Sequence, residues 1–182
     1  AAIRGCRQVF HLASTVRRAS GLRPGGGVDT AGARNVAAAC LEAGVERLIH
    51  ASTAGVYGLI RDGDAPVDET SPARPNSHYR AGKLQAERHL LGRHKRDGLP
   101  VVVARLTDIV GARAILWLGL CRAISTGGFR VIGTGRNVNQ LCHVSDVVAG
   151  LELCAQRPGI EGRCYLLSGD RPIPIAELLA WI

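Results

Sequence analysis

The sequence of 182 residues contains no methionine, even at position 1, and only two of its 23 basic residues, Lys83 and Lys95, are lysines. The missing methionine at position 1 predicts that the chain is an internal piece of a longer product. Aromatic residues make up only 4% of the sequence, too few for the stacking platform with which proteins bind single-stranded nucleic acid. The net charge of +8 comes from arginines scattered along the chain. We therefore expect a solvated basic surface and no nucleic-acid partner.

The chain also lacks any run approaching the ~18 uninterrupted apolar residues of a membrane-spanning helix. No charged segment followed by an apolar one opens the sequence in the manner of a secretory leader. With 46% hydrophobic and 21% charged residues, the composition is that of a globular protein. The sequence therefore predicts a compact cytoplasmic protein with no membrane partner.

The six cysteines form no Cys-x-x-Cys pair and no spaced Cys/His set of the kind that binds zinc. Cys40, Cys121 and Cys154 fall inside apolar helical patterns, where a free cysteine packs as a small hydrophobic residue. We expect reduced thiols and no metal site.

Short apolar strands alternate with helical patterns along the chain. Strands are expected at residues 8–13, 47–52, 101–106, 129–132, 140–144 and 163–168, and helices at 33–42, 77–97, 114–126, 147–156 and 176–182. Such an alternation is typical of a parallel sheet covered by helices on both faces. The predicted fold class is α/β.

The pattern that points most directly to chemistry is Tyr79-Arg-Ala-Gly-Lys83, at the start of the expected helix 77–97. Residues four apart lie on the same face of a helix. A free phenol has a pKa near ~10 and is a poor base at neutral pH. A neighbouring ammonium and the positive end of a helix both favour phenolate, which would let the pair exchange a proton with a substrate hydroxyl. The alternative is a surface tyrosine packed on a lysine stem.

Two further segments place small polar residues at the carboxyl ends of expected strands, where open α/β sheets bind ligands. Ser52 and Thr53 end the strand at 47–52, and His11-Leu-Ala-Ser14 ends the strand at 8–13. A hydroxyl at Thr53 could bind a substrate oxygen, and small residues at 13–14 would let a flat ligand lie against the backbone. The alternatives are a helix-capping hydroxyl and ordinary tight packing.

Together these segments resemble the extended short-chain dehydrogenase/reductase family, which includes the NAD-dependent epimerase/dehydratase group. The resemblance covers essentially the whole chain, in order, and is carried by residues 9–14, 32–36, 53–58, 79–87, 105–111 and 143–148. It implies a partial Rossmann-like, doubly wound parallel sheet with a small C-terminal substrate-binding portion. Residues 1–112 would form strands four to six of the dinucleotide-binding domain with their helices. Residues 113–182 would form the substrate-binding portion and return a final strand to the sheet.

The resemblance also implies roles for individual residues. Tyr79 would exchange the substrate hydroxyl proton, Lys83 would lower the Tyr79 pKa and hold the nicotinamide ribose, and Thr53 would bind the same substrate oxygen. The cofactor would be NAD or NADP, and the partner a small-molecule substrate. The residues expected to bind the cofactor are Leu12, Ala13, Ser14, Ser52, Tyr79, Lys83 and Leu106. Family analogy further suggests a homodimer formed through the helices at 33–42 and 77–97.

The sequence departs from the family by lacking its Gly-x-x-Gly-x-x-Gly turn, because the glycines at 25–27 follow the strand-four motif and not a first strand. That turn brings backbone N–H groups and a helix N-terminus to the cofactor pyrophosphate. The chain alone is therefore expected to bind dinucleotide poorly and to be inactive. Without the first strand, the strand at 8–13 would be an exposed apolar edge, a site of aggregation.

Three departures bear on the substrate. Ala54-Gly55 replaces the Asp-Glu that follows the catalytic Thr in family dehydratases, and Asn139 and Asp108 stand where nucleotide-sugar epimerases have Arg and Asn. These departures favour the prediction of an NAD(P)-dependent oxidoreductase that acts on an alcohol or ketone, like hydroxysteroid dehydrogenases and dihydroflavonol reductases. A nucleotide-sugar epimerase of the same family is the alternative within the class. A non-catalytic dinucleotide-fold binding module, or an inactive fragment, is the alternative from another class.

Overall fold

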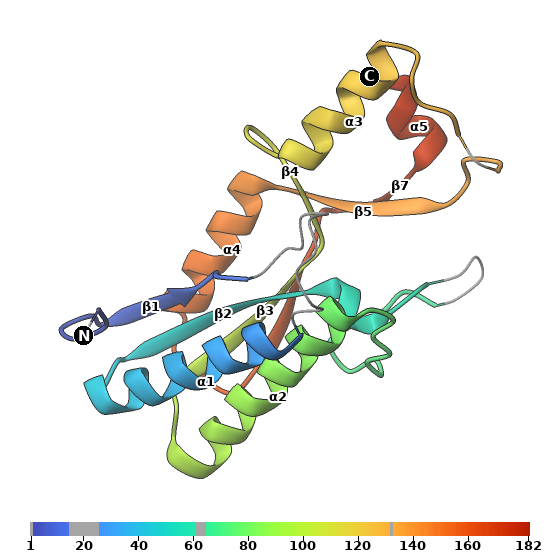
Figure 1. Cartoon of the computed structure of the whole chain (residues 1–182). Coiled ribbons are helices and arrows are strands. Elements are labelled where there is room, and N and C mark those ends of the chain that lie inside the picture. The colour runs from blue at the N-terminus through green and yellow to red at the C-terminus, as the bar shows by residue number, and fades with distance from the viewer. Residues whose placement is uncertain (1, 15–25, 61–64, 132) are drawn as a thin grey trace. The chain divides into compact units, whose positions relative to one another are not determined.

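The computed structural model of the chain describes residues 2–14, 26–60, 65–131 and 133–182. The chain folds into two compact units, coloured along the chain in Figure 1. Unit 1 contains Ala1–Arg105 and Leu151–Leu166, and unit 2 contains Leu106–Gly150 and Leu167–Ile182. The division into a dinucleotide-binding portion (residues 1–112) and a substrate-binding portion (residues 113–182) remains a prediction.

Unit 1 is built on a four-stranded sheet with the order β1-β2-β3-β6. The strands are β1 (Gln8–His11), β2 (Arg47–Thr53), β3 (Val101–Leu106) and β6 (Cys164–Leu167). β1 pairs with β2 in parallel, with His11 opposite His50. Nearly every residue of β2 and β3 is buried, as expected for strands covered on both faces. The predicted α/β fold is therefore confirmed.

Two helices of unit 1, α1 (Gly26–Ala43) and α2 (His78–Asp97), lie side by side against the sheet (Figure 1). Small side chains at Ala33, Ala37 and Cys40 recur on one face of α1 and are fully buried, which lets the helices approach closely. Leu90 of α2 joins the same core. The Ser77 side chain caps the start of α2 by accepting a hydrogen bond from the Arg80 N–H.

The sheet of unit 1 has β1 at one edge. Phe10 and Leu12, in and just after β1, are 42% and 54% exposed. β1 is shorter than the strand predicted at residues 8–13, and it lies at the exposed edge of the sheet as the sequence predicted.

Unit 2 contains a smaller sheet with the order β4-β5-β7. Its strands are β4 (Asp108–Val110), β5 (Val138–His143) and β7 (Pro172–Pro174). β4 pairs with β5 in parallel and β5 pairs with β7 in antiparallel fashion. The helices are α3 (Ile115–Ser125) and α5 (Ile175–Ala180), while α4 (Val144–Gln156) has residues in both units.

Several elements differ from their predicted ranges. Of the strand predicted at residues 129–132, residues 129–131 form no strand and stay exposed, and residue 132 lies outside the described residues. α4 begins three residues before the predicted start at 147, since the Ser145 N–H is capped by the His143 side chain. α1 begins at Gly26, seven residues before the predicted start at 33.

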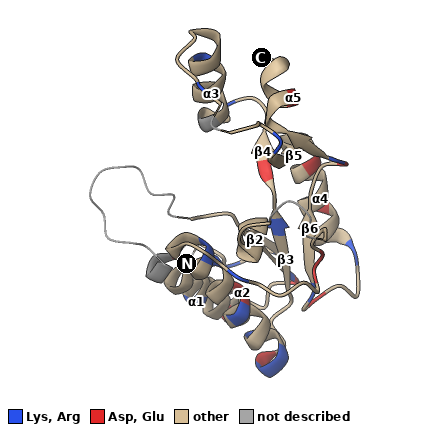
Figure 2. Ribbon diagram, turned by 90° about the vertical axis from the view of Figure 1, so that its right-hand side faces the viewer, with Lys and Arg blue, Asp and Glu red and all other residues tan. Residues whose placement is uncertain are grey.

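Charged residues of both signs are interspersed along the elements of the chain (Figure 2). No helix in the described part of the chain is long and apolar enough to cross a membrane. The six cysteines are free thiols. Burial raises the pKa of Cys40 to about 11 and that of Cys164 to about 12, so both are held as unreactive thiols at neutral pH.

Candidate active site

One face of α2 carries Tyr79, Lys83 and Glu87, each four residues from the next. This spacing places them in a row along the helix. Lys83 and Glu87 are only 3% and 1% exposed, whereas Tyr79 is 38% exposed. The row therefore runs from a phenol that solvent and ligands can reach to a carboxylate in the interior.

Lys83 is fixed beneath the carboxyl end of β2. Its Nζ donates a hydrogen bond to the Ala51 carbonyl at 3.0 Å. Burial lowers the pKa of Lys83, while the carboxylates of Asp29 and Glu87 raise it. The hydrogen bond places the ammonium two residues from Thr53 along β2, so α2 and the end of β2 are joined at the candidate site.

The Tyr79 phenol holds its proton more strongly than a free tyrosine. Burial raises the pKa of Tyr79, a hydrogen bond with Ser14 lowers it, and Asp29 raises it again, so that the net shift is upward. The sequence predicted a downward shift from Lys83 and the helix N-terminus. The difference arises because burial dominates at this position and the Lys83 ammonium is directed to the Ala51 carbonyl. At neutral pH the phenol is consequently an acid that can donate a proton.

Thr53 ends β2 and caps the short 3-10 helix η1 (Ala54–Tyr57). Its Oγ1 accepts a hydrogen bond from the Gly55 N–H at 3.1 Å, which leaves the hydroxyl proton available to a ligand. The turn closes at Gly58, where φ is 89° and an added Cβ would lie 2.3 Å from the Arg74 carbonyl oxygen. Only glycine fits there, so the path of the chain after Thr53 is tightly fixed.

Thr53→Ala removes both the cap and the hydroxyl that we predict to bind a substrate oxygen. We expect a stability loss of about 1 kcal/mol and a fall in kcat of roughly 10²-fold, typical of losing one donor to a reacting oxygen. Thr53→Ser keeps both functions and should restore both values. Thermal unfolding and steady-state kinetics of the active protein that carries this chain check the prediction. A Thr53→Ala variant with full turnover would limit Thr53 to the capping role.

The residues predicted to bind the cofactor are distributed over unit 1 and its boundary. Leu12, Ala13 and Ser14 follow β1 and are exposed, and Ser14 contacts Tyr79. Leu106 is the last residue of β3. Ser52 lies elsewhere, because its side chain is buried and donates to Glu87 inside the unit. The structure thus brings Ser14 to the Tyr79 phenol and turns the Ser52 hydroxyl inward.

Sequence reasoning missed a pair of buried histidines beneath this site. His11 and His50 are partners across β1 and β2, with their Nδ1 atoms 3.0 Å apart. They are 8% and 1% exposed, and the His50 Nε2 has no hydrogen-bond partner among the described residues. The two Nδ1 atoms share one hydrogen bond, in which one ring donates and the other accepts. The strands' register, which sequence alone did not give, is what brings the two rings together.

Unit 2 has a cavity of its own, with a volume of about 230 Å³. Residues 109–114 and Val144 line it, and Arg113 is the one charged side chain among them. Arg113 has a φ of 70°, a left-handed conformation that side chains other than glycine rarely adopt. The remaining lining is aliphatic or glycine.

The sequence pattern of the NAD dependent epimerase/dehydratase family matches residues 1–166. The chain belongs to this family. The predicted resemblance is therefore confirmed.

Similar proteins include a 4-hydroxy-2-methyl-3-oxo-4-farnesyl-3,4-dihydroquinoline-1-oxide ketoreductase of Stigmatella aurantiaca, 33% identical over 96% of this chain and 52% of the relative. A 3beta-hydroxysteroid-dehydrogenase/decarboxylase of Arabidopsis thaliana is 29% identical over 97% of this chain and 43% of its own length. The chain thus spans about half the length of these curated relatives.

Among solved structures, the dTDP-glucose 4,6-dehydratase DesIV of Streptomyces venezuelae, with NAD bound, superposes with a TM-score of 0.85. It is 26% identical, and the match covers 99% of this chain and 57% of that chain. The match supports the same partial Rossmann-like architecture and shows that a structural neighbour binds NAD.

Proposed function

We propose that the protein containing this chain is an NAD(P)-dependent oxidoreductase that interconverts a ketone and an alcohol. The observation that carries the proposal is the arrangement of an accessible, protonated Tyr79, a buried Lys83 one helical turn behind it, and the Thr53 hydroxyl at the end of the adjoining strand. Ketone reduction needs a proton donor at the substrate oxygen, and a phenol that keeps its proton at neutral pH can fill this role.

Each residue has one task in this mechanism. Tyr79 donates its proton to the carbonyl oxygen in reduction and takes it back in oxidation. Thr53 donates a hydrogen bond to the same oxygen as negative charge develops there. Lys83, one helical turn from Tyr79 and held by the Ala51 carbonyl, is the residue that we expect to hold the nicotinamide ribose of a bound cofactor. The nicotinamide cofactor, when bound, supplies or accepts the hydride.

The described residues fit such a cofactor in part. Leu12, Ala13 and Ser14 leave β1 at the carboxyl end of the parallel β1–β2 pair with their side chains exposed, where open α/β sheets bind ligands. Tyr79 and Lys83 lie on α2, the helix that packs against β2. The segment that would hold the pyrophosphate has no counterpart in the sequence, so binding of NAD(P) by the isolated 182 residues is expected to be weaker than micromolar.

An apolar alcohol or ketone is the substrate class we favour. Both curated relatives described above carry names that denote reduction or oxidation at a carbonyl or hydroxyl group. Ala54-Gly55 follows Thr53 in place of the acidic pair that family dehydratases use. A nucleotide-sugar epimerase remains the alternative, and a homodimer through α1 and α2 remains a prediction.

The test is an assay of the active protein that carries this chain with reduced cofactor and two substrate panels, apolar ketones and nucleotide sugars. We expect cofactor oxidation that matches alcohol formation mole for mole with the ketones. Interconversion of nucleotide sugars without net cofactor oxidation would favour the epimerase. Cofactor binding with no turnover on either panel would favour a binding module and contradict the proposal.

The pH dependence of ketone reduction follows from the raised pKa of Tyr79. Below that pKa the phenol holds the proton it must donate, so kcat/KM should be constant across neutral pH. As the pH rises through the pKa, the acid is lost and kcat/KM should fall tenfold per pH unit. A pH profile measured with the apolar ketone checks this expectation, and a rate that increases from neutral to alkaline pH would contradict it.

A further inference from the structure

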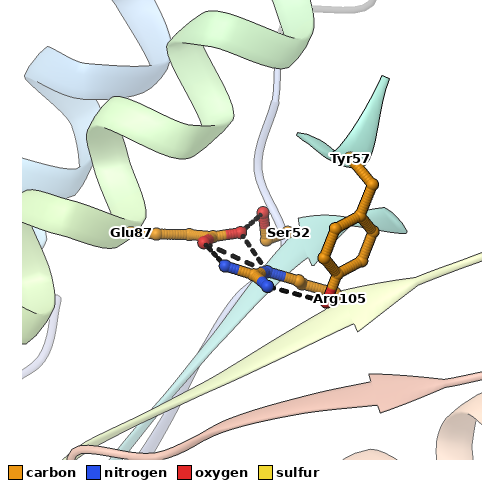
Figure 3. Close-up of polar contacts among 4 residues, drawn as sticks. All are labelled: Ser52, Tyr57, Glu87 and Arg105. Carbon is orange, nitrogen blue, oxygen red and sulfur yellow. Dashed lines mark hydrogen bonds and ion pairs between the residues drawn. The ribbon is translucent and has the colours of Figure 1, made fainter. Parts of the chain in front are cut away.

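Four buried polar residues of unit 1 form one hydrogen-bonded network behind the candidate site (Figure 3). The Glu87 carboxylate accepts from the Arg105 Nη2 at 2.8 Å and from the Arg105 Nε at 3.2 Å to each oxygen. It also accepts from the Ser52 hydroxyl. The Arg105 Nη1 donates to the Tyr57 hydroxyl at 2.7 Å. The network joins α2 to β2, η1 and β3.

The residues of this network are close in the chain to Thr53, Tyr79 and Lys83, the candidate catalytic residues. Ser52 directly precedes Thr53, and Tyr57 is the last residue of the η1 turn that Thr53 caps. The network therefore holds the Thr53 turn at both ends. On the other side, Glu87 lies one helical turn beyond Lys83 and two beyond Tyr79 on the same face of α2.

A buried ion pair is a poor source of stability, because removing two charges from water costs about as much as their attraction returns. Apolar side chains of similar size could fill the same space. What an apolar pair lacks is direction, since a guanidinium and a carboxylate that meet through two parallel hydrogen bonds fix their mutual orientation. Glu87 and Arg105 are 1% and 8% exposed. Water therefore neither screens their charges nor competes for their hydrogen bonds.

We propose that Glu87 and Arg105 are positioning residues, whose ion pair sets the register between the α2 face that carries Tyr79 and Lys83 and the turn that carries Thr53. This inference rests on the proposed function, because it concerns the same reacting oxygen. Neither residue touches the substrate. They act by holding two donors, the phenol and the threonine hydroxyl, at the spacing that one oxygen atom requires, and small errors in such spacing lower turnover strongly.

The experiment uses the active protein that carries this chain and compares single and double replacements. E87M and R105M each leave a buried charge without its partner and should lower the thermal midpoint of unfolding. The double variant E87M/R105M removes both charges and should recover that midpoint. We nevertheless expect its kcat to stay about 10- to 100-fold below the original value, with the KM for the cofactor changed less than about threefold.

The matched control is the ion pair between Arg93 and Asp97, which lies on the same helix but is partly exposed. The double variant R93Q/D97N removes it and should leave kcat unchanged. If E87M/R105M does not fold, the R105K variant tests the inference instead. Lysine keeps the positive charge but cannot form the bidentate hydrogen bonds that arginine makes to a carboxylate. We expect R105K to lower kcat about tenfold at constant cofactor KM.

Full activity in a stable E87M/R105M variant, or unchanged kcat in R105K, would overturn the inference and leave the pair a purely structural role. Failure of the proposed function is seen separately with Y79F. If Y79F retains turnover, the proton-transfer assignment itself is wrong. If Y79F is inactive while E87M/R105M is fully active, only the positioning role is lost.

Discussion

Tyr79→Phe is expected to lower kcat by roughly 10²- to 10⁴-fold, the range that a positioned general acid or base contributes. The substitution removes one oxygen and leaves the ring, so the packing that makes the phenol partly buried is retained. The proton donor to the substrate oxygen is lost, and so is the hydrogen bond with Ser14.

Most of the cofactor affinity should survive this change, because Lys83, Leu12 and Ala13 are untouched and the Tyr79 ring is retained. Cofactor affinity measured by fluorescence and turnover measured by cofactor absorbance therefore separate the two effects. Tyr165→Phe, a change of the same kind on β6, serves as the control and should leave kcat unaffected. A Tyr79→Phe variant that turns over normally would rule out Tyr79 as the proton donor.

Mild acid is expected to destabilise the fold through His50. Burial, the neighbouring His11 and the Lys83 ammonium lower the pKa of His50 to about 3. An exposed histidine of the unfolded chain titrates near ~6.5. Between these two values the unfolded chain binds a proton that the folded chain does not, so stability is complete above about pH 6.5 and falls as the pH decreases toward 3.

The size of the effect follows from the same shift. One pKa unit corresponds to about 1.4 kcal/mol, so His50 alone should cost about 2 kcal/mol of unfolding free energy between pH 7 and roughly pH 5. Replacement by a residue that does not titrate, His50→Gln, should lower stability at pH 7 and flatten its dependence on pH. Urea unfolding at several pH values measures both quantities.

The control for acid unfolding is His78→Gln, at the exposed first residue of α2. This variant should keep the pH dependence of the original chain. Parallel stability curves for the original chain and the His50→Gln variant would show that His50 is protonated equally in both states. That result would contradict the buried, neutral histidine pair.

The sequence by itself determined the α/β class, most of the helices and strands, and the family. Local rules suffice for these features: β2 and β3 are short runs of apolar residues, and Ser77 and Gly98 mark the ends of α2. The row formed by Tyr79 and Lys83 also needs no more than the helical repeat. Strands of three residues, such as β4 and β7, escaped because so short a segment has no period to recognise.

Only the tertiary structure decided the environment of those residues. Glu87 and Arg105 are 18 positions apart, and His11 and His50 are 39 apart, so no spacing rule could pair them. The upward shift of the Tyr79 pKa likewise depends on how much of the phenol the fold buries. Sequence periodicity fixes which face of an element a side chain occupies, whereas desolvation and directional pairing depend on what another element places against that face.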